Sequence, residues 1–171
     1  MGLLVKEIET KTEIDKVCDF MKNNITQTLM RSQGFSAASA KTMADSIKFT
    51  NPKELISILS KKKVICYGLF FNDEIMGVSV FNQENLTFLF LGSHLHRNTI
   101  EILKILLKKS LMLPVVSKKE AHYLYIDALT GYVDKYHKVG FEVSGKPVNL
   151  KGGLVLQPMS YEISQMGSEN Y

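Results

Sequence analysis

The sequence predicts one mixed α and β domain, with a single largely antiparallel sheet and helices on both of its faces. Three observations support this. The chain has 171 residues, a length that suits one domain. Its 45% hydrophobic and 22% charged residues allow a normal core. Helical and strand-like segments are interspersed, without an internal repeat or a long linker. We therefore expect residues 1–163 to form the domain and residues 164–171 to form a polar tail.

The first part of the chain predicts one strand followed by two or three helices. Thr12 is expected to cap the first helix, whose apolar residues recur at helical spacing. Asn51 and Pro52 suit the cap and the first turn of a later helix. The expected strand covers residues 3–9, and the helices cover 13–29, part of 31–49, and 51–63.

The rest of the chain is richer in β-branched and aromatic residues. Asn72 and Asp73 form a turn dipeptide between two such runs, which predicts a hairpin. Pro114 is expected to limit a helix, and Gly140 to end another, with Phe141 packed behind it. The expected strands cover residues 64–71, 74–81, 86–92, 121–129, 141–150 and 153–163, and the helices cover 98–113 and 131–140.

Charge and cysteine content limit the classes of partner. The net charge of +4 is below that expected of a dedicated nucleic-acid binder, so we do not expect such a partner. Cys18 and Cys66 fit a reducing compartment better than a disulfide scaffold. No run approaches the roughly 20 apolar residues that span a bilayer, and the start lacks a secretory pattern. We expect a cytoplasmic protein without a membrane partner, either a monomer or a homodimer.

Three stretches of sequence carry a resemblance to a known family. The hairpin FFNDEIMGVSVF (70–81) has a polar turn and a glycine in its returning strand. FLFLGSHLHRNTIEILKILLKK (88–109) resembles a strand, a ligand-contacting loop and a helix. YLYIDALTGYVDKYHKVGFEVSG (123–145) places a tyrosine on a helix four residues before a Gly-Phe pair. Together these stretches resemble the GNAT acyltransferase superfamily. The resemblance implies a mostly antiparallel sheet of six to seven strands, splayed between its fourth and fifth strands.

The resemblance also implies a function. It implies an N-acetyltransferase that moves acetyl from acetyl-CoA to a primary amine of a small molecule or peptide by direct attack. The acetyl-CoA arm is expected to lie between the splayed strands, where a backbone N–H polarises the thioester carbonyl. The pyrophosphate is expected on the N–H groups that open the following helix. No metal is expected, because His94 and His96 lack a third ligand at suitable spacing.

Two catalytic residues are expected from this resemblance. Tyr136 takes the place of the family's proton donor to the leaving thiolate, although a tyrosine packed on the sheet is the ordinary alternative. Glu84, which precedes the fourth strand, is the expected base. Asp127 is an alternative base, since Tyr123, Tyr125 and Asp127 alternate onto one face of a strand and could line the acceptor side.

The phosphate loop departs from the family pattern, which places glycines after an Arg or Gln. In a register anchored on His96, the glycine positions hold Thr99 and Glu101. In the register anchored on Arg97, which we prefer, they hold Ile100 and Ile102, and the Glu101 carboxylate is kept off those positions. The expected cofactor-binding residues are Leu91, Gly92, His96, Arg97, Asn98, Thr99, Ile100, Glu101 and Ile102.

This departure leaves two alternatives open. Without glycines in the loop, the chain could be a GNAT-fold binding or regulatory protein that has lost catalysis. With its positive charge, it could instead resemble the superfamily's toxin branch, which acetylates aminoacyl-tRNA. The acceptor is expected to meet residues 31–39 and the turn after Lys151. Carboxylates are sparse in both segments, so a polyamine or aminoglycoside acceptor is not favoured.

Overall fold

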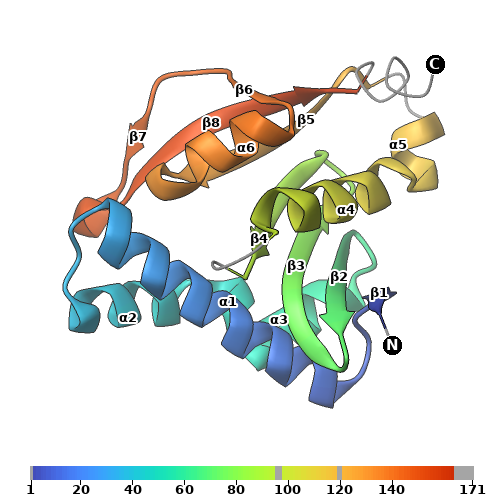
Figure 1. Ribbon diagram of the computed structural model, residues 1–171, viewed down its shortest axis with the longest axis horizontal. Helices are drawn as coiled ribbons and strands as arrows, with labels where there is room; N and C mark the ends of the chain where they lie inside the picture. Colours follow the sequence, from blue (N-terminus) through green and yellow to red (C-terminus); the bar gives the residue numbers. More distant parts are fainter. Residues whose placement is uncertain (1, 95–97, 119–120, 164–171) are drawn as a thin grey trace.

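The protein forms one eight-stranded sheet with helices on both faces (Figure 1). The computed structural model describes residues 2–94, 98–118 and 121–163. The sheet order is β1-β2-β3-β4-β5-β8-β6, and β7 also pairs with β8. The strands are β1 (Leu3–Glu7), β2 (Val64–Phe71), β3 (Glu74–Asn82), β4 (Thr87–Ser93), β5 (Tyr123–Leu129), β6 (Phe141–Val143), β7 (Val148–Asn149) and β8 (Val155–Glu162). The helices are α1 (Lys11–Ser32), α2 (Ala37–Ser46), η1 (Lys48–Thr50), α3 (Pro52–Ser60), α4 (Thr99–Leu111), α5 (Pro114–Lys118), η2 (Thr130–Tyr132), α6 (Val133–Val139) and η3 (Lys151–Gly153).

This architecture confirms the predicted fold class, with two differences in its elements. The sheet has eight strands rather than six or seven, because the strand predicted over 141–150 divides into β6 and β7. Pro114 follows the end of α4, as predicted, but it also opens the short helix α5. Proline suits that first position because its missing N–H would have no partner there.

The two faces of the sheet bury separate apolar clusters. Helices α1, α2 and α3 cover one face, where Val17 and Met21 pack with Val80 and Phe90. Helices α4, α5 and α6 cover the other face, where Leu103 packs among strand residues. The sheet is therefore buried from both sides over β2, β3 and β4, which explains why these strands are nearly continuous apolar runs.

The start of α1 corrects one sequence prediction. The N-cap is Thr10 and not Thr12, because Thr10 and Glu13 form a capping box. The Glu13 N–H donates to Thr10 Oγ1 at 3.2 Å, and the Thr10 N–H donates to the Glu13 carboxylate at 3.2 Å. Asn51, by contrast, caps α3 as predicted, accepting from the Lys53 N–H at 3.1 Å.

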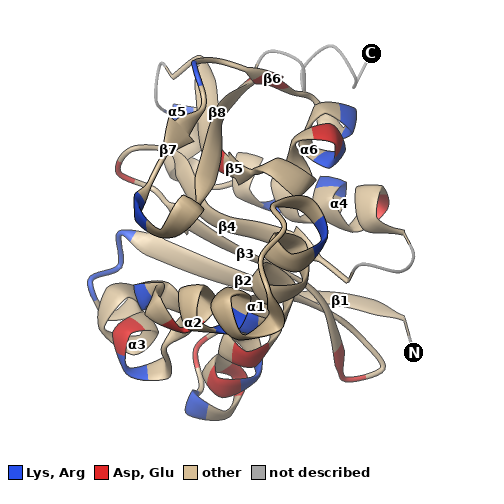
Figure 2. Cartoon of the chain, turned by 90° about the vertical axis from the view of Figure 1, so that its left-hand side faces the viewer, with Lys and Arg blue, Asp and Glu red and all other residues tan. Residues whose placement is uncertain are grey.

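Strands β4 and β5 diverge and leave a fork in the sheet. Their parallel pairing is confined to Thr87 with Tyr125 and Phe88 with Ile126. Figure 2 shows β5 and β8 rising at a steep angle from the plane of β2, β3 and β4. The predicted splay is therefore confirmed. At the fork, Leu89 is an extra residue of β4, since Val80 of β3 faces Phe90 while the next residue faces Phe88.

Helix α4 lies close to β3 at a glycine. A Cβ atom at Gly77 would lie 2.5 Å from Ile102 Cγ2 and 3.0 Å from Leu106 Cδ1. The missing side chain on β3 therefore makes room for the bulky Ile102, which is buried. This contact fixes where α4 begins relative to the end of β4.

None of the helices in the described ranges is both long enough and apolar enough to cross a bilayer.

Candidate functional site

A cavity of about 320 Å³ opens beside the fork, on the side covered by α1. It lies between β4, β5 and β8 and is closed by α1, η1 and the segment around η3. Its lining residues are Asn24, Ile25, Ile47, Phe49, Thr87, Phe88, Leu89, Phe90, Leu91, Ile126, Asp127, Leu129, Tyr132, Tyr136, Leu150, Leu154 and Leu156.

Tyr136 reaches this cavity from α6. Its side chain is 5% exposed and packs against the rings of Tyr132 and Phe141, with centroids 5.1 Å and 5.7 Å away. Its hydroxyl donates a hydrogen bond to the Leu91 carbonyl at 2.5 Å. Burial, followed by the neighbouring Tyr132, raises the pKa of Tyr136 well above its ordinary value. A neutral phenol is therefore held at the edge of β4 inside the fork.

The helix that carries Tyr136 ends as the sequence predicts. Gly140 adopts φ 116° as the left-handed C-cap of α6, and Phe141 is fully buried behind it. Helix termination by Gly140 is confirmed, and the proton-donor role of Tyr136 stays a prediction. The glycine ends the helix, and the tyrosine faces the fork.

A second group of polar side chains ties α1 to the end of β4. Asn24 Nδ2 donates to the Ser93 carbonyl and to the Tyr132 hydroxyl, each at 2.9 Å. The Tyr132 hydroxyl also donates to the Ser93 carbonyl at 3.3 Å. Sequence reasoning did not single out Asn24 or Tyr132. A signal was present for each, since Asn24 interrupts the apolar stripe of α1 and Tyr132 precedes Tyr136 at helical spacing.

These hydrogen bonds occupy the edge of β4 that faces β5. The His94 N–H donates to the Met76 carbonyl of β3 at 2.7 Å, so alternation turns the backbone groups of Leu91 and Ser93 to the other edge. The Tyr136 hydroxyl donates to the Leu91 carbonyl, and the Tyr132 hydroxyl donates to the Ser93 carbonyl. Two tyrosine hydroxyls thus stand where β5 would otherwise continue the sheet.

The structure brings Asp127 to the cavity but places Glu84 elsewhere. Asp127 lines the cavity from the end of β5, and its carboxylate has no ion-pair partner among the described residues. Glu84 lies in the turn between β3 and β4, where its side chain is 64% exposed and pairs with Lys63 at 3.4 Å. Tyr123 and Tyr125 are exposed on β5 and do not line the cavity.

The expected cofactor-binding residues lie at the end of β4 and the start of α4. Leu91 and Gly92 are on β4, whereas His96 and Arg97 fall outside the described residues. Asn98 is the N-cap of α4 with φ 55°, and the Thr99 hydroxyl donates to the His94 carbonyl at 3.1 Å. Glu101 is exposed in the first turn. Ile102, at a glycine position of the preferred register, points into the sheet and not towards the loop.

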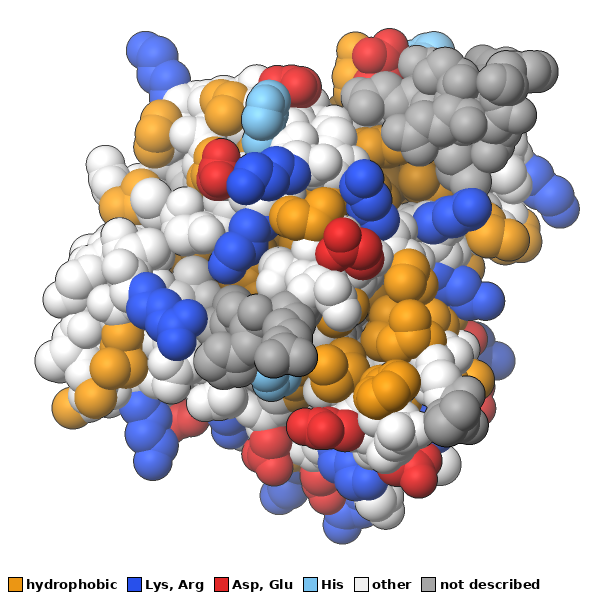
Figure 3. All heavy atoms as spheres, viewed as in Figure 1, with side chains coloured by type: hydrophobic (Ala, Val, Ile, Leu, Met, Phe, Trp, Pro, Cys, Tyr) orange, Lys and Arg blue, Asp and Glu red, His pale blue; other side chains and the backbone are white. Residues whose placement is uncertain are grey.

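Basic side chains lie over the face of the molecule that carries α4 and α6. Figure 3 shows Lys and Arg side chains gathered over this face. The Lys135 ammonium lies over the Tyr132 ring, 4.8 Å from its centroid. Burial, with a smaller effect of Arg31, lowers the pKa of Lys135. In the described ranges no group of three or more His, Cys, Asp or Glu side chains could hold a metal ion.

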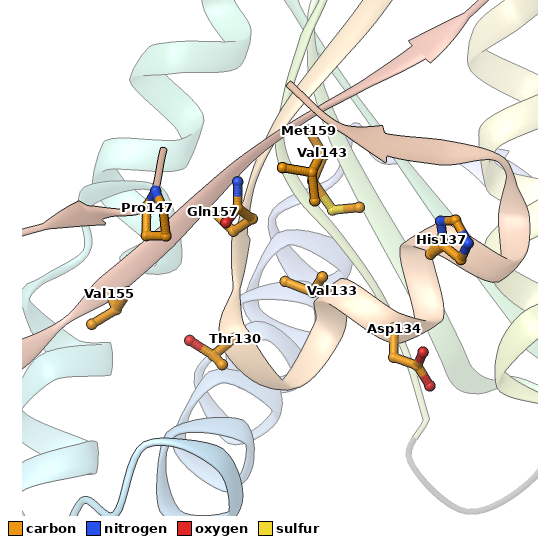
Figure 4. Close-up of a pocket in the computed structure, with 9 residues that line it drawn as sticks. All are labelled: Thr130, Val133, Asp134, His137, Val143, Pro147, Val155, Gln157 and Met159. Carbon is orange, nitrogen blue, oxygen red and sulfur yellow. The ribbon is translucent and has the colours of Figure 1, made fainter. Parts of the chain in front are cut away.

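A separate cavity of about 500 Å³ lies along a different face of α6 (Figure 4). Val133, Asp134 and His137 line it from α6, and Gln157 and Met159 line it from β8. It shares no lining residue with the cavity at the fork, so the two are distinct sites.

Comparisons with known proteins bear on the fold. No protein-family model and no curated protein sequence matches the chain. Solved structures do match. The PaiA N-acetyltransferase of Thermoplasma acidophilum, in complex with coenzyme A, matches with a TM-score of 0.72 at 13% identity, over 95% of this chain and 99% of that one.

Two further structures match over nearly the whole chain. The acetyltransferase AAC(6')-Ib, in complex with ribostamycin and coenzyme A, has a TM-score of 0.63 at 13% identity and covers 100% of this chain and 99% of its own. A GNAT-family acetyltransferase of Streptococcus pneumoniae has a TM-score of 0.62 at 18% identity and covers 94% of this chain and 98% of its own. At these identities the likeness establishes a shared fold.

Proposed function

Because the chain has the GNAT fold, we propose that it is an N-acetyltransferase that moves acetyl from acetyl-CoA to a primary amine of a small molecule or peptide. The observation that carries the proposal is the open fork between β4 and β5, with the protonated hydroxyl of Tyr136 inside it and a cavity beside it. A donor in the fork and an acceptor in the cavity could meet at this point.

In the proposed reaction a neutral amine attacks the thioester carbonyl. A C–N bond forms, the C–S bond breaks, and the sulfur leaves as a thiolate that accepts a hydrogen bond from the Tyr136 hydroxyl, which gives up its bond to the Leu91 carbonyl. The nitrogen loses a proton to solvent as the amide forms, and solvent protonates the thiolate. A phenol has a pKa near 10 and a thiol near 8.5, so full transfer is uphill for an ordinary tyrosine. The raised pKa of Tyr136 keeps its proton in place, so the hydroxyl acts chiefly as a hydrogen-bond donor to the charge that develops on sulfur.

The ammonium form of the acceptor must lose a proton before it attacks. Asp127 is the better-supported base, since it lines the cavity and Glu84 lies in a distant turn paired with Lys63. Asp127 would accept that proton and pass it to solvent, because the residue is exposed at the cavity mouth. Leu89, the extra residue of β4, lines the same cavity. A backbone N–H of β4 at this bulge would polarise the thioester carbonyl.

The start of α4 is the proposed site for the pyrophosphate. Backbone N–H groups at a helix start attract anions, and the Thr99 hydrogen bond to His94 fixes this turn. The burial of Ile102 against Gly77 supports binding here, because it removes one bulky side chain from the loop. Leu91, Gly92, Asn98, Thr99, Ile100 and the undescribed His96 and Arg97 complete the proposed set, while Glu101 opposes it by charge.

The first experiment measures acetyl-CoA binding and turnover separately. Calorimetry should give a Kd below about 100 μM, in the range of ordinary metabolite affinities. Tyr136→Phe keeps the ring and removes the hydroxyl, so we expect turnover to fall by about 100-fold or more while the Kd for acetyl-CoA changes little. Tyr125→Phe, at an exposed position outside the cavity, is the control and should keep full turnover. Unchanged turnover in Tyr136→Phe would remove this residue from the mechanism.

A second candidate is a GNAT-fold binding or regulatory protein without catalysis. The hydrogen bonds that Tyr132 and Tyr136 make to β4 favour it, because they occupy carbonyls that face the fork. Calorimetry decides between the two: no heat and no thermal shift at millimolar acetyl-CoA would support this candidate. The cytoplasmic location and the monomeric or homodimeric state stay predictions.

A further inference from the structure

We infer that the cavity beside the fork selects an amine with one positive charge and an apolar body of about ten non-hydrogen atoms, held at its ammonium end by Asp127. This rests on the proposed function, since it names the acceptor class of that site. Four features of the cavity support it: apolar walls, polar groups that already have partners, the Asp127 carboxylate, and the volume.

Apolar side chains form most of the walls. Ile47, the N-cap of η1, and Phe49 within η1 contribute to the walls, and the Phe49 ring lies 6.4 Å from that of Phe90 on β4. Leu89 and Leu150 are 36% and 45% exposed, so apolar surface is still in contact with solvent at the cavity. Covering such surface with a hydrocarbon group is favourable by about 25 cal/mol per Å². A ligand with an apolar body therefore gains most from this cavity.

Most polar groups of the lining already have partners in the protein. Asn24 and Tyr132 bond to each other and to Ser93, and Tyr136 donates to Leu91. The Thr87 hydroxyl donates to the Asn85 carbonyl at 3.3 Å. A sugar or polyamine buried here would leave several of its own polar groups without partners, each at a cost of about 1–3 kcal/mol.

Asp127 is the exception. It is the one charged side chain among the described residues that line the cavity, and it has no ion-pair partner among the described residues. A single carboxylate at the mouth of an apolar cavity matches a single ammonium group. It cannot neutralise the several charges of a polyamine. A hydrocarbon acyl chain has no charged or polar group that could pair with this carboxylate.

The volume sets the size of the ligand. A cavity of about 320 Å³ has the volume of roughly ten water molecules at about 30 Å³ each. It lies at the low end of the range for small-molecule sites. An arylalkyl amine such as 2-phenylethylamine, with a short linker between ring and nitrogen, has this size and one charge.

The test measures ligand binding without requiring turnover. Three ligands are used: 2-phenylethylamine, 2-phenylethanol and spermidine. With coenzyme A present, calorimetry measures the binding of each ligand to the wild type, to Asp127→Asn and to Glu162→Gln. We expect the wild type to bind the amine at least tenfold more tightly than either the alcohol or spermidine. In Asp127→Asn the preference for amine over alcohol should fall to within about twofold. Glu162→Gln, an exposed carboxylate of β8 outside the cavity, should match the wild type.

The outcomes separate this inference from the proposed function. If spermidine binds as tightly as the aryl amine, or if the alcohol binds as tightly as the amine, the inference is wrong even where acetyl transfer is observed. If hexanoyl-CoA is preferred to acetyl-CoA and no amine binds, the cavity holds an acyl chain and the inference is again wrong. If the amine binds through Asp127 but no acetylated product forms, the site assignment stands and the proposed reaction fails.

Discussion

Tyrosine hydroxyls bond to the backbone carbonyls at the edge of β4 where β5 has diverged from it. A buried backbone carbonyl without a partner is costly, and β5 leaves β4 after Phe88. Tyr132 and Tyr136 supply hydroxyl donors to the Ser93 and Leu91 carbonyls, and Asn24 adds a third donor from α1. The fork is therefore a stable part of the folded chain before any ligand binds.

Removing one of these hydroxyls should lower stability. In Tyr132→Phe the Asn24 amide loses an acceptor and the Ser93 carbonyl loses one of its donors, so we expect the free energy of unfolding to fall by about 1–3 kcal/mol. Urea denaturation followed by circular dichroism measures this. Tyr123→Phe is the matched control, because Tyr123 is 42% exposed and its change should stay within about 0.5 kcal/mol. Equal midpoints for the two variants would contradict the assigned role of the hydroxyl.

The placement of α4 depends on its contact with β3. Gly77 has no side chain, so Ile102 and Leu106 can approach the sheet backbone closely. Ile102, which stands at a glycine position of the proposed phosphate-loop register, is thus accommodated by a glycine on β3. Sequence similarity read one position at a time does not detect such a pair.

Adding a methyl group at this contact should disturb both packing and ligand binding. In Gly77→Ala the new Cβ would lie 2.5 Å from Ile102 Cγ2, so we expect a loss of about 1–3 kcal/mol in the free energy of unfolding. We also expect weaker acetyl-CoA binding, because the start of α4 must shift. Gly145→Ala is the control, since its Cβ would meet Pro158 at an ordinary 3.6 Å. Thermal unfolding measures the stability of both variants, and calorimetry measures their binding of acetyl-CoA. Equal stability and equal binding in the two variants would contradict the proposed contact.

The whole molecule buries its two cysteines in one of its two cores. Cys18 of α1 and Cys66 of β2 both belong to the cluster under α1, α2 and α3. Burial raises the pKa of Cys18 to about 11 and raises the pKa of Cys66 further. Thiols that keep their protons and have no access to solvent are poor nucleophiles. Neither cysteine has a place in the proposed chemistry.

Thiol labelling reports on the integrity of this core. At pH 8 a thiol with a pKa of about 11 is ionised in about one molecule in a thousand, before its burial is considered. We expect almost no reaction of the native protein with an aromatic disulfide reagent over minutes, and two reacting thiols per chain in denaturant. Cys66→Ser assigns the sites, because one thiol should remain. Rapid labelling of the native wild type would show that this core is open.

Local chemistry made parts of the fold predictable. Asn72 and Asp73 both adopt positive φ, 50° and 66°, as a two-residue hairpin turn requires. The dipeptide was therefore enough to predict this hairpin. Asn51 and Gly140 cap their helices through bonds within a few residues. The cap of α1 was misplaced by two residues because Thr10 and Thr12 are both capping residues, and the reciprocal bond with Glu13 selects Thr10.

The sequence by itself determined the fold class and the run of strands and helices, because periodicity, turn chemistry and caps act over a few neighbouring residues. Tyr136 was singled out only through the resemblance of its segment to the GNAT superfamily. Only the tertiary structure decided that Asn24 meets Tyr132, 108 residues away, and that Asp127 lines the cavity while Glu84 does not. Such placements depend on how far β5 turns from β4 and on which helix covers the gap. These are properties of the packed sheet, and no short segment of the chain encodes them.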